Sequence, residues 1–167
     1  MDKKIRVAQY GVGPIGAAIV RLMLQKPQLQ IVGAVDVDPE KAGKDLGRVV
    51  GLERDLGVKV SRGVQEVFNT GVDVIVHTTG SYLVKMVDQL EECIRGRAHI
   101  VSTCEELSYP FRKHPDLSRR LDGLAREHQV AILGTLCRKM ISSFHSRTAT
   151  WKLCTRGSWS ASAVSSW

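Results

Sequence analysis

Three glycines near the amino terminus could hold a phosphate group, because they are spaced as in the pattern G-x-G-x-x-G. The six residues of this segment are Gly11, Val12, Gly13, Pro14, Ile15 and Gly16. In such a segment the first glycine permits a tight turn, the second lets a diphosphate approach the backbone, and the third lets the next helix pack closely. The free N–H groups at the start of that helix then face the negative charge. The segment therefore predicts a dinucleotide site, provided that a strand precedes it and a helix follows.

A single carboxylate, Asp36, follows the last of these glycines by 20 residues. It ends a second apolar stretch, residues 31–35, which predicts a strand. A carboxylate at this place accepts hydrogen bonds from the adenosine ribose hydroxyls and repels a 2′-phosphate, which favours NAD over NADP. Lys41 and Lys44 are close enough in the sequence to offset part of that repulsion, so the use of both cofactors stays open.

Polar residues follow a third apolar stretch, residues 72–77, which predicts a buried parallel strand. Ligands of open parallel sheets sit beyond the carboxyl ends of the strands. Thr78, Thr79 and Gly80 are therefore predicted to contact the nicotinamide ribose and the diphosphate, the alternative being a polar loop that caps the next helix. His77, which ends the strand, is interpreted as a packed and hydrogen-bonded side chain rather than a catalytic one.

Two acidic residues, Glu105 and Glu106, follow the next expected strand, residues 99–101. They could hold a substrate ammonium or the nicotinamide side of the site; the alternative is a solvated acid pair at the start of a helix. Cys104 is interpreted as a small buried side chain, because no adjacent base is identifiable. The four cysteines are far apart and form no C-x-x-C pair, so no metal site is predicted. The catalytic group is left unknown.

The elements that must position these residues alternate between strands and helices. Strands are expected at residues 5–10, 31–35, 59–61, 72–77, 99–101 and 130–133, and helices at 17–24, 83–94 and 117–128, with a helix start at 38–40 and a helical turn at 64–69. This alternation predicts right-handed βαβ units. The expected fold class is thus α/β, with a Rossmann-type doubly wound parallel sheet.

The charge of the chain is unevenly distributed. Residues 1–134 contain 19 of the 24 Lys and Arg residues and all 17 acidic residues, whereas residues 135–167 contain five basic residues and no acidic one. The formal net charge of +7 therefore lies mostly near the carboxyl terminus, and the body has no basic excess that would indicate a nucleic-acid partner. Salt-sensitive binding of nucleic acid through the basic end alone is an alternative.

The composition also changes at residue 135. It divides the chain into an expected NAD(P)-binding domain, residues 1–135, and an irregular basic tail rich in Ser and Trp, residues 136–167. Three interpretations of the tail stay open: a disordered segment, a frameshifted or truncated product, and a functional basic arm. No apolar run approaches the roughly 20 residues of a membrane-spanning helix, and no secretory signal is recognisable, so a cytoplasmic protein with no membrane partner is expected.

Four segments together resemble one known family. They are the glycine segment with its strand (Val7 to Gly16), the strand end at Asp36, the segment His77-Thr78-Thr79-Gly80-Ser81, and the segment from Ser102 to Pro110. The last two are much more specific than the glycine pattern. The combination, which covers about residues 5–135, resembles the 2,4-diaminopentanoate dehydrogenases, which belong to the dihydrodipicolinate reductase-like group.

This resemblance implies an NAD(P)-dependent oxidoreductase that transfers a hydride at a carbon bearing an amine or imine, in a small amino-acid-like substrate. It also implies a second domain that binds the substrate and forms a homo-oligomer. The tail stands where that domain is expected, so the chain is predicted to be a cofactor-binding fragment with little or no turnover. Two alternatives stay open: a dihydrodipicolinate reductase-like enzyme of lysine biosynthesis, and a non-catalytic nucleotide-binding or regulatory module.

Overall fold

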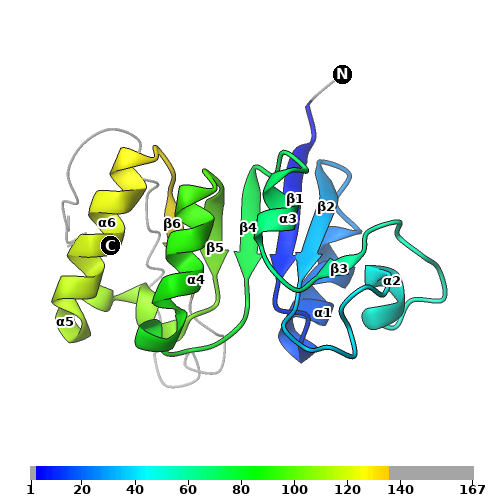
Figure 1. The fold of residues 1–167 in the computed structure, drawn as a ribbon, viewed down its shortest axis with the longest axis horizontal. Helices are drawn as coiled ribbons and strands as arrows, with labels where there is room; N and C mark the ends of the chain where they lie inside the picture. Colours follow the sequence, from blue (N-terminus) through cyan, green and yellow to red (C-terminus); the bar gives the residue numbers. More distant parts are fainter. Residues whose placement is uncertain (1–2, 136–167) are drawn as a thin grey trace, which may run out of the picture.

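The computed structural model describes residues 3–135 of the chain, which form one six-stranded parallel sheet with helices on both faces (Figure 1). The strands are β1 (Ile5–Tyr10), β2 (Leu29–Val35), β3 (Val60–Ser61), β4 (Val74–His77), β5 (His99–Ser102) and β6 (Ile132–Gly134). Their order in the sheet is β3-β2-β1-β4-β5-β6, and every neighbouring pair is parallel. The order reverses between β1 and β4, as in a doubly wound Rossmann sheet. The predicted fold class is confirmed.

The helices separate into two groups because the side chains of each strand alternate between the two faces of the sheet. They are α1 (Pro14–Met23), α2 (Leu46–Val49), α3 (Gln65–Phe68), α4 (Leu83–Arg95), α5 (Pro110–Lys113) and α6 (Pro115–Glu127), with a 3₁₀ turn, η1 (Glu105–Ser108), before α5. On one face Val7 packs with buried residues of α1 and α2. On the other face Ala8 and Tyr10 pack with α3, α4 and α6. Among the described residues, helices therefore cover both faces of the sheet.

The prediction of a helix that starts at residues 38–40 is wrong. Asp38 does accept a hydrogen bond from the Glu40 N–H (2.9 Å), as a helix cap would, but the chain makes only a turn there. The turn ends at Gly43, which has a φ of +81° and whose N–H donates to the carbonyl of Val60 at 2.8 Å. This bond ties the loop to β3, so a helix cannot continue. The short helix α2 begins instead after Asp45, whose carboxylate caps it.

The predicted domain boundary, membrane helices and metal sites can be compared with the structure only for the residues that it describes. Residues 136–167, the expected tail, lie outside the described residues, and the division at residue 135 stays a prediction. Among residues 3–135, no helix has the length and apolar character needed to cross a membrane. The same residues contain no cluster of three or more His, Cys, Asp or Glu side chains suited to a metal ion.

Candidate functional site

The glycine segment forms the turn between β1 and α1, as the pattern predicts. Gly11 has a φ of +88°, a conformation that residues with a Cβ atom rarely adopt, and its N–H donates to the carbonyl of Val35 at 2.8 Å. Gly13 is the N-cap of α1, and Pro14 occupies the first helical position, where its missing N–H costs nothing. The helix thus starts directly at the turn and directs its free N–H groups toward the carboxyl edge of the sheet.

Gly13 and Gly16 have opposite surroundings. A Cβ atom at Gly16 would lie 2.0 Å from the carbonyl oxygen of Gly11, so this position must be glycine for α1 to pack on the turn. A Cβ atom at Gly13 would meet nothing within 4 Å. The space at Gly13 is therefore open, as the close approach of a diphosphate to the backbone of such a turn requires.

Asp36 lies directly beside the glycine turn, although it comes from the end of β2. One of its carboxylate oxygens (Oδ2) accepts a hydrogen bond from the N–H of Val12 at 2.7 Å, and the other (Oδ1) accepts one from the N–H of Asp38 at 3.0 Å. The side chain is buried, with 10% of its surface exposed. The structure therefore brings the predicted ribose carboxylate and the predicted diphosphate turn into contact.

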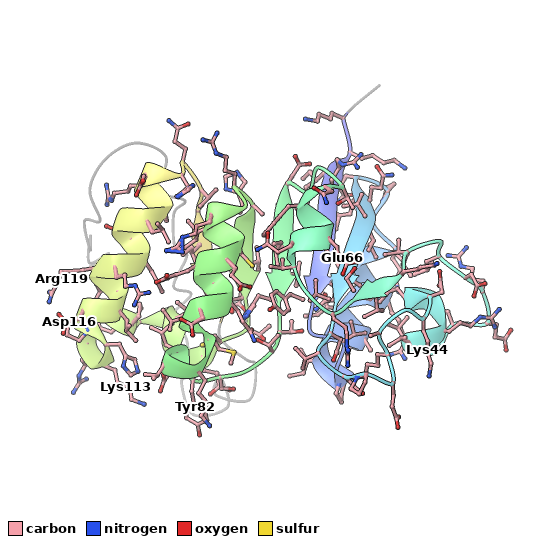
Figure 2. All side chains as sticks on the ribbon, viewed as in Figure 1. Lys44, Glu66, Tyr82, Lys113, Asp116 and Arg119 are labelled. Atoms are coloured by element: carbon pink, nitrogen blue, oxygen red, sulfur yellow. The ribbon has the colours of Figure 1, made fainter. Side chains whose placement is uncertain are left out.

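Lys41 adds a positive charge to this carboxylate. Its Nζ lies 3.3 Å from Asp36 and 3.3 Å from Asp38. Burial on its own would raise the pKa of Asp36, but the N–H groups of Asp38 and Val12, together with Lys41, outweigh it and hold the pKa below its ordinary value. Lys44, by contrast, is exposed and lies near α2 (Figure 2). Of the two lysines considered in the sequence, Lys41 is the one that reaches Asp36.

The segment after β4 contacts the glycine turn from the other side. The N–H of Thr78 donates to the carbonyl of Tyr10 (2.8 Å), and the Thr78 hydroxyl donates to the carbonyl of Gly11 (2.8 Å). The Thr79 hydroxyl points instead toward α4, where it donates to Oε1 of Gln89 (2.6 Å). Gly80 lies against the side chain of Met86. Thr78 is thus next to the expected diphosphate position, and the predicted contacts of Thr79 and Gly80 with the cofactor stay predictions.

His77 is fully buried and hydrogen-bonded on both ring nitrogens. Its Nδ1 lies 3.0 Å from the hydroxyl of Ser102 and its Nε2 lies 3.0 Å from Oε1 of Gln89. Burial lowers the pKa of His77, against a smaller opposite effect of Gln89, so the ring is neutral near pH 7. The ring also packs edge-on against Tyr10, with the ring centroids 5.4 Å apart. These contacts agree with the interpretation of His77 as a packed side chain that joins β4, β5 and α4.

The two acidic residues after β5 differ in their surroundings. Glu105 is exposed, whereas Glu106 accepts a hydrogen bond from the N–H of Leu83 (2.8 Å), the first residue of α4. Its carboxylate also pairs with Lys113 and with the Nε2 of His114 (2.9 Å). The bond from Lys113, followed by that from Leu83, lowers the pKa of Glu106 to about 2. Figure 2 places Lys113 near Tyr82, the residue before α4, at the carboxyl edge of the sheet. The proposed contact of either acid with a substrate stays a prediction.

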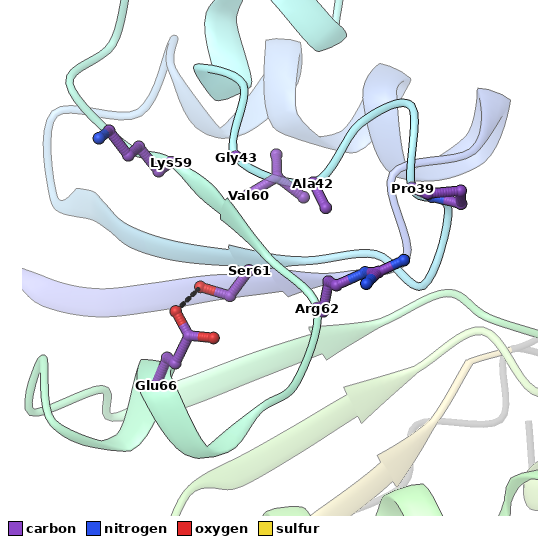
Figure 3. A pocket seen from close by; sticks show the side chains of 8 residues that line it. All are labelled: Pro39, Ala42, Gly43, Lys59, Val60, Ser61, Arg62 and Glu66. Atoms are coloured by element: carbon purple, nitrogen blue, oxygen red, sulfur yellow. Dashed lines mark hydrogen bonds between the residues drawn. The ribbon is translucent and has the colours of Figure 1, made fainter.

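A cleft of about 560 Å³, which was not predicted from the sequence, lies beside Asp36 (Figure 3). It is lined by Pro39, Ala42, Gly43, Lys59, Val60, Ser61, Arg62 and Glu66. The N–H of Asp36 donates to the carbonyl of Ser61 at 3.0 Å, which places the end of β3 next to the carboxylate. The sequence did offer a signal for this cleft, namely the polar residues that follow the expected strand at β3. Ligands of parallel sheets sit beyond strand ends, and this rule applies to β3 as it does to β1, β2 and β4.

The strand order, the glycine turn and the carboxylate at the end of β2 define a dinucleotide-binding domain of the Rossmann type. Comparison with known proteins identifies its family. Residues 5–104 match the family described as "Dihydrodipicolinate reductase, N-terminus". The chain belongs to this family, and it is the NAD(P)-binding domain of a dehydrogenase family.

Three relatives confirm the resemblance that the sequence indicated. The chain is 27% identical over 143 residues to a 2,4-diaminopentanoate dehydrogenase of Acetoanaerobium sticklandii, covering 80% of the chain and 38% of that protein. It is 32% identical over 101 residues to a 4-hydroxy-tetrahydrodipicolinate reductase of Wolbachia pipientis, covering 59% and 37%. The structure of an amine dehydrogenase from Mycobacterium smegmatis superposes with a TM-score of 0.76 at 40% identity, covering 78% and 39%. The chain therefore spans less than two fifths of the length of each relative.

Proposed function

We propose that the chain binds the diphosphate of NAD or NADP at the turn between β1 and α1, and the adenosine ribose at Asp36. One observation supports this most directly. The turn is open at Gly13, where a Cβ atom would meet nothing within 4 Å, and the Asp36 carboxylate lies against the same turn, 2.7 Å from the Val12 N–H. The proximity of an open turn and a carboxylate supports a diphosphate at the first and a ribose at the second.

The cofactor preference that we propose is NAD. A carboxylate has about four lone-pair positions, and the Asp36 carboxylate uses three of them, for Val12, Asp38 and Lys41. A ribose hydroxyl can take the fourth or replace the long contact with Lys41, whereas a 2′-phosphate would meet the negative charge of Asp36. Lys41 lowers this repulsion, since its ammonium lies 3.3 Å from the carboxylate. We therefore expect NADPH to bind measurably but more weakly than NADH.

The reaction that we propose for the intact protein is hydride transfer at a carbon that bears an amine. It is supported by the names of two relatives, a 2,4-diaminopentanoate dehydrogenase and an amine dehydrogenase. The bound nicotinamide supplies the hydride chemistry. The residues of this chain bind the dinucleotide, and those that follow the carboxyl ends of β4 and β5 orient its nicotinamide half.

A second candidate reaction is favoured by the family match over residues 5–104 and by the reductase relatives: reduction of 4-hydroxy-tetrahydrodipicolinate. Both candidates use the same cofactor site and differ in the substrate. Two assays of a full-length protein that contains this domain distinguish the two reactions. Formation of NADH or NADPH with 2,4-diaminopentanoate supports the first, and consumption of either with 4-hydroxy-tetrahydrodipicolinate supports the second.

The test of cofactor binding is a calorimetric titration of the 167-residue chain with NADH and, separately, with NADPH. We expect saturable binding of both, tighter for NADH, and weaker NADH binding by an Asp36→Asn variant. The variant Asp55→Asn is a matched control, because Asp55 is exposed and forms an ion pair with Arg48 on the surface. Absence of binding at millimolar NADH, with the chain folded, would contradict the proposed function.

A further inference from the structure

A polar side chain occupies the centre of the sheet. Gln9 lies in β1, which pairs with β2 on one side and with β4 on the other, and its exposed fraction is 0%. Strands of a parallel sheet that is covered on both faces are normally apolar throughout, and the neighbours Val7, Ala8 and Tyr10 follow that rule. Gln9 breaks it directly below the glycine turn.

The amide group of Gln9 forms its hydrogen bonds at the glycine turn. Its Nε2 donates one hydrogen bond to the carbonyl of Gly11 (2.9 Å) and another to the hydroxyl of Thr78 (2.9 Å). That hydroxyl in turn donates to the same Gly11 carbonyl at 2.8 Å. The side chain of Gln9, in β1, and that of Thr78, the residue after β4, therefore converge on one backbone oxygen, and α1 approaches the same oxygen at Gly16.

The other half of the Gln9 amide has no partner. Its Oε1 is buried, and among the described residues no donor reaches it. A buried carbonyl without a hydrogen bond destabilises the fold, and an apolar side chain of similar size would avoid that loss. The contribution of Gln9 is therefore concentrated in the two bonds that its Nε2 makes at the turn.

The bonded carbonyl determines where the next N–H points. The peptide group between Gly11 and Val12 is planar, so its C=O and its N–H point in opposite directions. Gln9 and Thr78 hold the carbonyl, and the N–H on the opposite side donates to Asp36 at 2.7 Å. One peptide plane thus links the inside of the sheet to the carboxylate expected to bind the ribose.

We infer that Gln9 is a positioning residue for the dinucleotide: with Thr78 it fixes the Gly11–Val12 peptide, and thereby the phosphate turn and the orientation of Asp36. This inference rests on the proposed cofactor binding. A positioning role and a purely stabilising role predict different results. If Gln9 only stabilised the fold, its replacement would lower the stability of the chain. Removing the Gln9 amide is therefore expected to lower the affinity for NADH without lowering the stability.

The test compares Gln9→Leu with the wild-type chain by NADH titration and by thermal unfolding. We expect Gln9→Leu to bind NADH about threefold to tenfold more weakly, the range of one net hydrogen bond, while its melting temperature stays the same or rises. Gln30→Leu is the matched control, because Gln30 is exposed near the start of β2, and it should bind as the wild type does. Unchanged NADH affinity in Gln9→Leu, or a lower melting temperature with full affinity, would overturn the inference.

A second pair of variants tests the same carbonyl from the neighbouring strand. Thr78→Val removes the hydroxyl and should weaken NADH binding as Gln9→Leu does, whereas Thr78→Ser keeps the hydroxyl and should restore it. Because Gln9 and Thr78 act on one oxygen, their combined effect should be smaller than the product of the single effects. Full additivity would contradict the shared role. If the wild-type chain binds no NADH, both the proposed function and this inference fail. If the wild-type chain binds NADH and the Gln9 and Thr78 variants bind it equally well, only the inference fails.

Discussion

Replacing Gly13 by alanine should separate cofactor binding from folding. Gly13 has φ −77° and ψ −171°, an extended conformation that alanine adopts without strain, and its Cβ atom would meet nothing within 4 Å. Alanine is a poorer N-cap than glycine, but the unfolded chain loses entropy when it gains a Cβ, and the two effects oppose each other. We expect the free energy of unfolding to change by less than about 1 kcal/mol.

The effect on binding should be much larger, because the new methyl group occupies the open space in front of the turn. A diphosphate displaced from this position loses at least one charge-assisted hydrogen bond to the backbone, worth about 1.5 to 3 kcal/mol. At about 1.4 kcal/mol for each factor of ten, the Kd for NADH should rise roughly 10-fold to 100-fold.

Two measurements check this expectation on the same samples: calorimetric titration with NADH, and urea unfolding. Gly123→Ala is the matched control, because Gly123 lies within α6, has nothing within 4 Å of its Cβ position and is remote from the turn. It should bind NADH normally and be more stable by up to about 1 kcal/mol. A Gly13→Ala variant that is folded and binds NADH as tightly as the wild type would refute the placement of the diphosphate.

Three further predictions concern the same edge of the sheet. Gly16→Ala should destabilise the fold by about 1 to 3 kcal/mol in urea unfolding, because its Cβ would lie 2.0 Å from the Gly11 carbonyl; normal stability would contradict this. Lys41→Ala should weaken NADPH binding about twofold to fivefold relative to NADH, as expected for a partly exposed charge; an unchanged ratio of the two Kd values would exclude a role in specificity. His77 should make the chain less stable in acid: burial lowers its folded pKa, so the unfolded chain takes up the proton first. The free energy of unfolding should then decrease as the pH falls below about 6.5, by up to about 1.4 kcal/mol per pH unit. The decrease should be smaller in His77→Gln. If urea unfolding at several pH values gives the same dependence on pH for the variant and the wild type, the prediction is refuted.

Several strands could be predicted from the sequence because a short run rich in apolar and β-branched residues ends at a polar or turn-forming residue. Residues 72–77, for example, contain β4, and the six residues of β1 have the predicted bounds. The turn after β2 could not be predicted in the same way. Asp38, Pro39 and Glu40 carry a normal helix-start signal, and what prevents the helix is a long-range bond from Gly43 to β3, which local sequence does not encode.

The candidate site was predictable where function requires a residue type and not predictable where packing decides. The glycine spacing and the distance to Asp36 follow from the shape of a dinucleotide, so they are readable in one sequence. The role of Gln9 is not, because a glutamine within an apolar strand resembles an exposed edge residue until its burial is known. The cleft beside β3 was not predicted either, although a strand was expected at residues 59–61, because its lining comes from residues 39–43, residues 59–62 and Glu66, which only the fold brings together.

Hydrogen bonds between main-chain atoms also hold the backbone at the carboxyl edge, beside the side-chain bonds of Gln9 and Thr78. The first N–H after β1 donates to the last carbonyl of β2, and the first N–H after β2 donates to the last carbonyl of β3. The first N–H after β4 likewise donates to the last carbonyl of β1. The ladder of the sheet thus extends one residue into each loop, and Gly11, Asp36 and Thr78 are the residues that it fixes. Because the framework is fixed in this way, substitutions that add no clash, such as Gly13→Ala, can alter the ligand site while the fold remains intact, and this is why binding and stability can be measured as separate properties of the same turn.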